Sequence, residues 1–325
     1  MTEPLALADV EAAAARIAPH VETTPLLEAP LLDAELGFRL LVKAESLQPV
    51  GAFKLRGAFN QILQLTDEER RRGVIAVSSG NHAQAVAYAA RAMGVAATIV
   101  MPQDAPRVKL ERTKALGARV EFYDRLSNDR DALTRRLAER EGLRFIHPYD
   151  DPRTIAGQGT IGLEIFAQTR AKGVAPEAII ASCSGGGLAS GIALTLGLYA
   201  RAPRMFTAEP AGFDDMRRSL ESGAAQVNAA LAGSICDALL APTPGRHTLP
   251  ILLACGARGL AATDAQVEAA MRVAAEHFRL VLEPGGAAAL ACALIERERF
   301  AGMTVVVIAS GGNVDRKDFA AILDR

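Results

Sequence analysis

Lys54 is the residue of this chain whose type and position point most directly to chemistry. It lies in the segment PVGAFKLRGA, residues 49–58, where a Pro/Gly turn leads into a predicted helix over residues 52–65. A lysine in the first helical turn meets the positive end of the helix dipole, which disfavours the charged ammonium. A neutral amine can attack a carbonyl carbon or accept a proton, so Lys54 is a candidate nucleophile and general base. A solvated surface lysine is the alternative interpretation.

Three short segments rich in glycine and hydroxyl groups follow predicted strands. They are Ser78-Ser79-Gly80-Asn81-His82, Ser182-Cys183-Ser184-Gly185-Gly186-Gly187-Leu188 and Ser310-Gly311-Gly312-Asn313. Backbone N–H groups in such turns can bind anions, and the first two segments lead into predicted helices whose N-termini also favour an anion.

The composition of each turn indicates which anion it suits. The triple glycine suits a phosphate, but it is not a P-loop, because no Gly-Lys-Ser/Thr follows. The first turn suits a carboxylate, with Ser78, Asn81 and His82 adding side-chain donors. An ordinary strand-to-helix connection is the alternative for any single turn. Their recurrence at strand ends favours a shared ligand site.

The elements that must position these residues alternate regularly between strand and helix from Gly73 onward. Strands are predicted at residues 74–77, 97–101, 119–123 and 144–146, and helices at 81–93, 106–116 and 129–141, each helix followed by a glycine. This order predicts a small parallel sheet covered by helices. Further strands are predicted at residues 39–44, 178–181, 206–208, 260–263 and 304–309.

We therefore predict an α/β protein with two open, mostly parallel twisted sheets flanked by helices. The smaller lobe is inserted in the larger one. Residues 1–69 and 151–325 form the predicted large domain, and residues 70–150 form the predicted small domain.

Composition and charge argue against several classes of function. The chain has 36 Lys and Arg against 37 Asp and Glu, a net charge of −1, and no Trp, which disfavours nucleic-acid binding. The four cysteines have no CxxC spacing, which fits a reducing compartment. The N-terminus carries acids where a signal peptide needs basic residues, and no uncharged stretch suits a membrane helix. We expect a cytoplasmic protein without nucleic-acid or membrane partners.

A family resemblance arises from the segments already quoted. Residues 51–57, 78–82, 184–188 and 310–313 resemble the motifs of pyridoxal-phosphate (PLP) enzymes of the tryptophan-synthase-β type, known as fold type II. Within that group the chain is most similar to threonine/serine dehydratases and serine racemase, over about residues 20–316. The resemblance implies pyridoxal 5'-phosphate as cofactor, an amino acid as substrate and a homodimer. It does not separate dehydratases from racemases, because both share these segments.

The resemblance also implies roles for individual residues. Lys54 would be the Schiff-base lysine, and Phe53 would pack beside the pyridine ring. Ser184, Gly185, Gly186, Gly187 and Leu188 would hold the cofactor phosphate, Asn81 would bind the ring hydroxyl, and Glu283 would line the side of the ring. Ser310 would face the pyridine nitrogen. Because a serine cannot protonate that nitrogen as an aspartate would, the ring is a weaker electron sink, and this favours early loss of a β-leaving group.

The implied reaction is β-elimination from a β-hydroxy L-amino acid, above all L-threonine or L-serine, to a 2-oxo acid and ammonia. Lys54 would remove the α-proton, and the turn with Ser78, Ser79, Asn81 and His82 would hold the substrate carboxylate. Ser79 lies where the family places an acid/base group on the opposite ring face, so serine racemisation stays an alternative. A third hypothesis is a protein that binds an amino acid or PLP without turnover, although a pure binder does not need Lys54.

Substrate choice depends on a few departures from serine racemase. Tyr149 stands where serine racemase has an asparagine and many dehydratases have an aromatic residue, and Ala238 and Ala241 replace a glycine and a serine. These differences favour a dehydratase. Arg130 matches an arginine that pairs with acidic ligands in racemase-like relatives, which adds 3-hydroxyaspartate as a candidate substrate. A solvated helix charge is the alternative interpretation of Arg130.

A divalent-cation site is implied by the segment Ala208-Glu209-Pro210-Ala211-Gly212-Phe213-Asp214-Asp215. The resemblance assigns the carboxylates of Glu209 and Asp215 and the carbonyl of Phe213 as ligands. Hard oxygen ligands of this kind suit Mg²⁺ or Ca²⁺. Two carboxylates at this spacing are also common in turns that bind no metal. Such a cation would be structural or activating.

Overall fold

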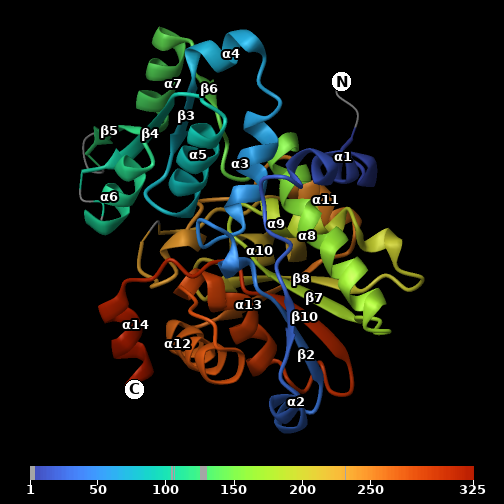
Figure 1. The fold of residues 1–325 in the computed structure, drawn as a ribbon. Coiled ribbons are helices and arrows are strands. Elements are labelled where there is room, and N and C mark those ends of the chain that lie inside the picture. Colours follow the sequence, from blue (N-terminus) through green and yellow to red (C-terminus); the bar gives the residue numbers. More distant parts are fainter. Residues whose placement is uncertain (1–3, 104, 106, 125–129, 231) are drawn as a thin grey trace.

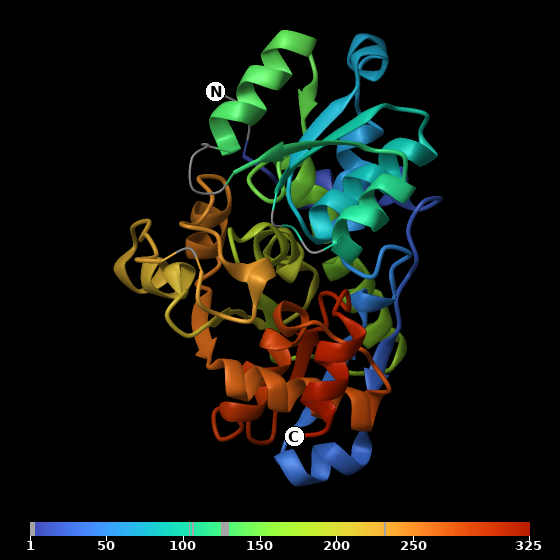
Figure 2. The same ribbon diagram turned by 90° about the vertical axis from the view of Figure 1, so that its left-hand side faces the viewer.

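Two sheets, each covered by helices, make up the chain in a computed structural model that describes residues 4–103, 105, 107–124, 130–230 and 232–325 (Figure 1). The larger sheet has six strands in the order β1-β2-β10-β7-β8-β9, and the smaller has four in the order β5-β4-β3-β6. Figures 1 and 2 both show the small sheet at one end of the molecule and the C-terminal helix at the other. The prediction of an α/β fold with two mostly parallel sheets is confirmed.

The small sheet is parallel throughout, as predicted. It consists of β3 (Val74–Val77), β4 (Ala97–Pro102), β5 (Arg119–Tyr123) and β6 (Arg144–Phe145), connected by α5 (Asn81–Ala92), α6 (Arg107–Ala115) and α7 (Arg130–Glu141). Gly94, Gly117 and Gly142 follow the three helices with positive φ, as the prediction of helix ends required. Pro106 and Asp129, the predicted first residues of two helices, lie outside the described residues.

The large sheet contains one antiparallel edge strand that the sequence did not predict. This strand, β1 (Leu26–Glu28), pairs with β2 (Arg39–Lys43), and three residues are too few for a periodic pattern to be recognised. The other strands, all parallel, are β10 (Thr304–Ile308), β7 (Ala178–Ser182), β8 (Arg204–Pro210) and β9 (Arg258–Ala262). Thr263 was predicted as strand but caps the next helix, since its hydroxyl accepts from the N–H of Gln266 at 3.4 Å.

Helices cover both faces of the large sheet. The helices other than α5, α6 and α7 are α1 (Leu7–Ile17), α2 (Pro30–Leu36), α3 (Lys54–Ile62), α4 (Asp67–Arg72), α8 (Pro152–Ala171), α9 (Gly187–Ala193), α10 (Asp215–Ser222), α11 (Thr248–Ala254), α12 (Asp264–Val273), α13 (Pro284–Ile295) and α14 (Arg316–Leu323). Of these, α4 lies beside the small sheet (Figure 1). Short helical turns occur at η1 (Glu45–Leu47), η2 (Leu196–Leu198), η3 (Asp237–Leu239) and η4 (Ala274–Phe278).

The side chains of β10 alternate between the cores on the two faces of the large sheet. Val305 and Val307 pack with α12 and α13 in one core, whereas Val306 and Ile308 pack with α8, α9 and α11 in another. Because side chains of a strand alternate between faces, a strand buried on both sides is apolar throughout, which explains the run TVVVI.

Helix α3 lies between the two sheets and packs with the small one. Leu55 and Phe59 of α3 share a core with Val74 and Ile99 of the small sheet. The predicted division at residue 70 assigns α3 to the large domain, and that division stays a prediction.

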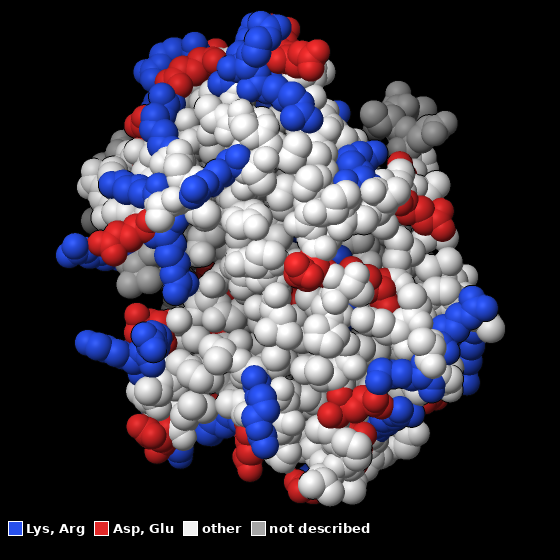
Figure 3. Space-filling model, viewed as in Figure 1, with Lys and Arg blue, Asp and Glu red and all other residues white. Residues whose placement is uncertain are grey.

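Charged groups of both signs are interspersed over the face seen in Figure 3, and the middle of that face is mostly uncharged. Among the helices of the described residues, none is both long enough and apolar enough to cross a membrane.

Candidate active site

A cavity of about 960 Å³ lies where strands of both sheets reach their carboxyl ends. Val77 of β3, Ser182 of β7 and Ser310 after β10 contribute to its wall. All the residues predicted to bind cofactor or substrate line it: Phe53, Lys54, Ser78, Ser79, Asn81, His82, Arg130, Ser184, Gly185, Gly186, Gly187, Leu188, Glu283 and Ser310. The volume suits a cofactor together with a small substrate.

Lys54 lies in the first turn of its helix, as the sequence predicted, and its amine points into the cavity. Helix α3 spans Lys54–Ile62 and is shorter than the predicted 52–65. The Nζ atom donates to the carbonyl oxygen of Pro148 at 2.8 Å and lies 5.0 Å from the centre of the Phe53 ring. Burial lowers the pKa of Lys54 from its ordinary value to about 8. The amine is therefore neutral in about a tenth to a fifth of molecules between pH 7 and 7.4, far more than an ordinary lysine, and a nucleophile or general base must be neutral.

Two histidines border the same cavity, and the sequence pointed to only one of them. His82 Nε2 lies 2.9 Å from the Ile146 carbonyl oxygen, so this nitrogen carries the proton and donates. Burial, together with the nearby Lys54, lowers the pKa of His82 to about 3. His147 was not predicted, and its Nδ1 accepts the backbone N–H groups of Tyr149 at 3.2 Å and Asp150 at 2.7 Å. Its position two residues after the end of β6 was the feature of the sequence that could have identified it as a site residue.

The glycine segment 184–188 connects β7 to α9 and includes the first two residues of that helix, Gly187 and Leu188. Gly186 has φ +95°, and a Cβ atom there would lie 2.7 Å from a Met216 methyl group and 2.8 Å from the Thr248 hydroxyl. Thr248 Oγ1 donates to the Gly185 carbonyl oxygen at 2.6 Å and anchors the loop from behind. No sequence pattern indicated Thr248, because it lies 63 positions away.

Ser184 completes the loop as a donor. Its Oγ accepts the backbone N–H of Ala241 at 3.1 Å, so its own O–H stays available to donate. A segment at the cavity wall with little side-chain bulk, an available hydroxyl donor and the N-terminal backbone amides of a helix fits a phosphate group.

Asn81 joins the small sheet to loops of the large sheet. Its Nδ2 donates to the Glu283 carboxylate, and its Oδ1 accepts from Asn313 Nδ2 at 2.8 Å. Asn313 also donates to the Val50 carbonyl oxygen at 2.8 Å. The amide of Asn81 thus has a defined orientation. Asn313 was part of a quoted motif, but its contact with Asn81 could not be read from the sequence.

The rim of the cavity carries cationic and small side chains. Arg130 is the first residue of α7, is exposed to solvent, and lines the cavity together with Arg135. Tyr149, Ala238 and Ala241 also line it.

Glu209 and Asp215 form a separate buried acidic pair outside the cavity wall. The Glu209 carboxylate accepts the backbone N–H groups of Met216 at 2.9 Å and Arg217 at 2.7 Å. Asp215 Oδ1 accepts from Asn228 at 2.6 Å, whereas its Oδ2 is buried without a hydrogen-bond partner. Burial raises the pKa of Asp215 to about 6, and burial and Asp215 together raise the pKa of Glu209 well above its ordinary value.

An orphaned carboxylate oxygen beside a second buried carboxylate fits a bound cation. Phe213, the third predicted ligand, lies between the two acids in the chain and is buried. Within the described ranges, no three His, Cys, Asp or Glu side chains cluster as a metal site, so a cation here would depend on carbonyl or water ligands as well.

Comparison with known proteins places the chain in a family. Residues 17–311 match the family described as pyridoxal-phosphate dependent enzyme. The chain belongs to this family. Within it, the chain is a fold-type II enzyme of the serine/threonine dehydratase–serine racemase group. The predicted resemblance and cofactor are confirmed at this level.

Its relatives have different activities. The chain is 38% identical over 315 residues to an L-threo-3-hydroxyaspartate ammonia-lyase from Pseudomonas sp, covering 97% of each chain. It is 35% identical over 318 residues to a serine racemase from Schizosaccharomyces pombe, covering 98% of this chain and 97% of the other. A crystal structure of T.th. threonine deaminase superposes with a TM-score of 0.89 at 42% identity, covering 95% of this chain and 99% of that one. These relatives support PLP-dependent β-elimination or racemisation of an amino acid.

Proposed function

We propose that the protein catalyses β-elimination of a β-hydroxy L-amino acid, above all L-threonine or L-serine, to a 2-oxo acid and ammonia. The observation that carries this proposal is the buried amine of Lys54, which points into a cavity large enough for cofactor and substrate. Its pKa of about 8 leaves it able to accept a proton. A protein that only binds an amino acid has no need of such a base.

The cofactor side of the cavity follows from the loops around Lys54. Pyridoxal phosphate, when bound, supplies a ring that accepts electrons from the substrate α-carbon. The backbone N–H groups of residues 184–188 and the Ser184 hydroxyl would hold its phosphate. Phe53 and Glu283 would line the ring, Asn81 would donate to the ring hydroxyl, and Ser310 would face the ring nitrogen.

The substrate side is formed by the start of α5. Ser78, Ser79 and the backbone N–H groups at the N-terminus of this 12-residue helix would bind the substrate carboxylate. His82 stays neutral there and adds no charge. Lys54 Nζ would take the α-proton, and the β-hydroxyl would leave as water after gaining a proton, for which the Lys54 ammonium formed in that step is a source. Hydrolysis of the enamine product would yield the 2-oxo acid and ammonia.

The wall of the cavity supports a dehydratase for small substrates. The Tyr149 ring and the methyl groups of Ala238 and Ala241 line it. The ring and the two alanine methyl groups would contact the methyl of threonine, and the alanines offer no donor where a serine would offer its hydroxyl to a substrate carboxylate.

Elimination of 3-hydroxyaspartate is a second candidate, which Arg130 favours. The guanidinium lies at the rim, where it could meet a β-carboxylate. We expect Arg130→Ala to lower kcat/KM for L-threo-3-hydroxyaspartate by about 10-fold or more, the loss of one charge-assisted contact, and to leave the value for L-threonine unchanged.

The deciding experiment separates the products of PLP-loaded protein on a chiral column, with L-serine, L-threonine and L-threo-3-hydroxyaspartate supplied separately in the presence of Mg²⁺. Stoichiometric 2-oxo acid and ammonia from L-threonine or L-serine would support the proposal. Turnover of hydroxyaspartate alone would favour the second candidate. An enantiomer without oxo acid would assign racemisation, and loss of that product in Ser79→Ala would identify Ser79 as its second acid/base.

A matched pair of lysine variants tests the role of Lys54 in the same assay. Lys54→Ala should lower kcat by about 10³-fold or more, because it removes the base. Lys172→Ala removes a lysine that pairs with Glu28 away from the cavity and should leave kcat unchanged. Equal activity of both variants would contradict the role of Lys54 as the base, and absence of product from the unmodified protein with every substrate would favour a binding protein.

We also propose that Glu209, Asp215 and the Phe213 carbonyl hold Mg²⁺ or Ca²⁺ in a structural or activating role. The buried, unpartnered Asp215 Oδ2 supports this assignment. The family resemblance further supports a homodimer, which sedimentation of the PLP-loaded protein would test.

A further inference from the structure

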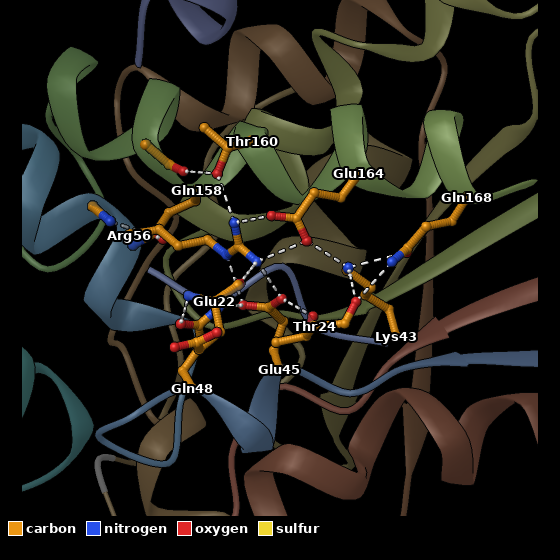
Figure 4. Close-up of polar contacts among 12 residues, drawn as sticks. Glu22, Thr24, Lys43, Glu45, Gln48, Arg56, Gln158, Thr160, Glu164 and Gln168 are labelled. Atoms are coloured by element: carbon orange, nitrogen blue, oxygen red, sulfur yellow. Dashed lines mark hydrogen bonds and ion pairs between the residues drawn. The ribbon is translucent and has the colours of Figure 1, made fainter. Parts of the chain in front are cut away.

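Arg56 is buried only two residues after Lys54, yet it does not line the cavity. Successive residues of a helix are about 100° apart, so residues 54 and 56 of α3 lie on nearly opposite sides of the helix. Figure 4 shows the guanidinium between Glu45 of η1 and Glu164 of α8. The proposed reaction makes no direct use of this group.

The guanidinium binds two carboxylates, each through both oxygens. Arg56 Nε and one terminal nitrogen donate to Glu45 at 2.8 Å each. The terminal nitrogens also donate to Glu164, at 2.6 and 3.0 Å. The Thr160 hydroxyl and the Glu22 carbonyl accept at 3.2 Å each, which leaves every N–H of the side chain engaged.

Lys43 closes this arrangement into a neutral cluster, which we call the Arg56 cluster: Lys43, Glu45, Arg56 and Glu164 (Figure 4). Lys43 Nζ donates to the Thr24 carbonyl oxygen at 2.6 Å, to Glu164 at 2.5 Å and to Gln168 at 3.1 Å. Two cations and two carboxylates balance. Burying such a cluster yields little net stability compared with apolar residues of similar size, but its directional bonds permit only one geometry.

The cluster ties the start of α3 to three other elements. Glu45 lies in η1, Lys43 in β2 and Glu164 in α8. Where α3 crosses α8, the helices meet at glycines, because a Cβ atom on Gly157 would lie 2.8 Å from the Arg56 carbonyl oxygen. Glycine contacts allow a close approach but do not resist rotation or sliding. In the first turn of α3 the Arg56 side chain supplies that resistance, and the Gly57 N–H adds one bond to Gln158 at 3.2 Å. Further along α3, Asn60 and Gln61 bond to the start of α8.

We propose that Arg56 is a positioning residue for Lys54: by holding the first turn of α3 against η1 and α8, it keeps the Lys54 amine inside the cavity at the Pro148 carbonyl. This inference rests on the proposed role of Lys54 as the base. A misplacement of about 1 Å at a reacting group can lower a rate by about 100-fold, so an anchor directly behind that group matters for the reaction.

The test measures the Lys54 amine itself. The full chain, freed of cofactor, is acetylated briefly with acetic anhydride at a series of pH values, and mass spectrometry of the Lys54 peptide gives the midpoint of its reactivity. We expect a midpoint near pH 8 in the unmodified protein. In Arg56→Met and Arg56→Lys it should rise by about one pH unit or more, because a displaced amine regains water. A lysine cannot bind both carboxylates bidentately, so the conservative variant should not restore the midpoint.

Two further variants distinguish positioning from stability. Gln61→Met removes another buried polar side chain of α3, one that bonds to Thr154 at 3.1 Å and not to the Arg56 cluster. It should lower the thermal midpoint and leave the Lys54 reactivity midpoint unchanged. Glu164→Gln keeps the shape of a partly exposed carboxylate and should raise the Lys54 midpoint by a smaller amount, which decides the question if the Arg56 variants do not fold.

An unchanged Lys54 midpoint in the folded Arg56 variants, or in Glu164→Gln where those do not fold, would overturn the inference. So would an equal rise in Gln61→Met. Because acetylation needs no substrate turnover, a shifted midpoint together with absent lyase activity would leave the positioning role intact and contradict only the proposed reaction.

Discussion

Two basic side chains in the cavity illustrate how burial acts at the scale of single residues. It lowers the pKa of Lys54 to about 8 and that of His82 to about 3. The same physical cause has different chemical consequences, because the ordinary values differ. The lysine becomes a base that is usable near neutral pH, whereas the histidine stays uncharged and serves as a fixed donor to Ile146. The base of the proposed reaction is therefore Lys54.

The lowered pKa of His82 predicts acid lability. The unfolded chain takes up a proton below pH 6.5, whereas folded His82 does so only near pH 3. Its contribution to stability is therefore complete above pH 6.5 and is lost as the pH falls toward 3. At pH 5 the loss should be about 2 kcal/mol. His82→Gln keeps a donor but cannot titrate, so urea unfolding at pH 7 and pH 5 should show a smaller loss in the variant; equal losses would contradict this.

At the scale of elements, the turns that follow the strands form much of the cavity wall. β7, β3 and β10 each lead into a turn that faces the cavity, and α13 contributes Glu283 at its N-cap. Since parallel strands present their carboxyl ends at one edge, turns distant in sequence converge there. The glycine loop and the acidic pair around β8 each yield a prediction at this scale.

Gly186→Ala should weaken cofactor binding by about 10-fold or more. The substitution strains a backbone at φ +95° and forces a Cβ atom against Met216 and Thr248, so the phosphate loop must move. Gly37→Ala is the matched control, with φ +76° but open space around the Cβ position. It should cost about 1 kcal/mol of stability and leave PLP affinity, measured by fluorescence titration, unchanged. Equal PLP affinities of the two variants would be inconsistent with this role of the loop.

The acidic pair predicts a pH-dependent response to Mg²⁺. The pKa of Asp215 is raised to about 6 in the folded chain, so folded Asp215 holds a proton that the unfolded chain releases near pH 4. This stabilising contribution is lost as the pH rises through 6, and there a cation can replace the proton. Mg²⁺ at about 100 times its Kd should add about 2.7 kcal/mol at pH 7.5 and less at pH 5. Asp215→Asn should abolish the gain in thermal unfolding; an unaltered gain would locate the cation elsewhere.

At the scale of the whole molecule, the cavity is lined by residues from around both sheets. Asn81 belongs to the small sheet's first connecting helix, whereas its partner Glu283 lies at the N-cap of α13 and its partner Asn313 follows β10, both in the part of the chain around the large sheet. A ligand at this junction contacts both halves. Loading the cofactor should therefore stabilise the molecule as a unit.

Pyridoxal phosphate at about 100 times its Kd should raise the free energy of unfolding by about 2.7 kcal/mol, because it binds the folded chain only. Asn313→Ala frees the Asn81 amide from its orientation and should reduce this gain, while leaving the stability of the cofactor-free chain within about 1 kcal/mol. Differential scanning calorimetry with and without cofactor measures both quantities. A full gain in the variant would show that the Asn81–Asn313 contact does not serve cofactor binding.

Local patterns were sufficient to predict most of the fold. Apolar runs such as TVVVI, and glycines such as Gly94 and Gly117 that follow helices, specify elements through neighbouring residues alone. The motifs that gather at strand ends also identified the residues that line the cavity, because parallel topology brings those ends together. The three residues of β1 were too few for a pattern, and several helices of the large domain, such as α8, were expected only as helices between strands, without bounds.

The tuning and the placement of those residues depend on tertiary packing. The pKa of Lys54 results from burial beneath several elements, and its acceptor is the carbonyl of Pro148, 94 positions away. Arg56 meets Glu164 across 108 positions, and Asn81 meets Asn313 across 232. Burial and long-range hydrogen bonds are sums over neighbours brought together by folding, so no window of sequence contains them. Local sequence thus specified which groups reach the cavity, and packing determined what those groups can do there.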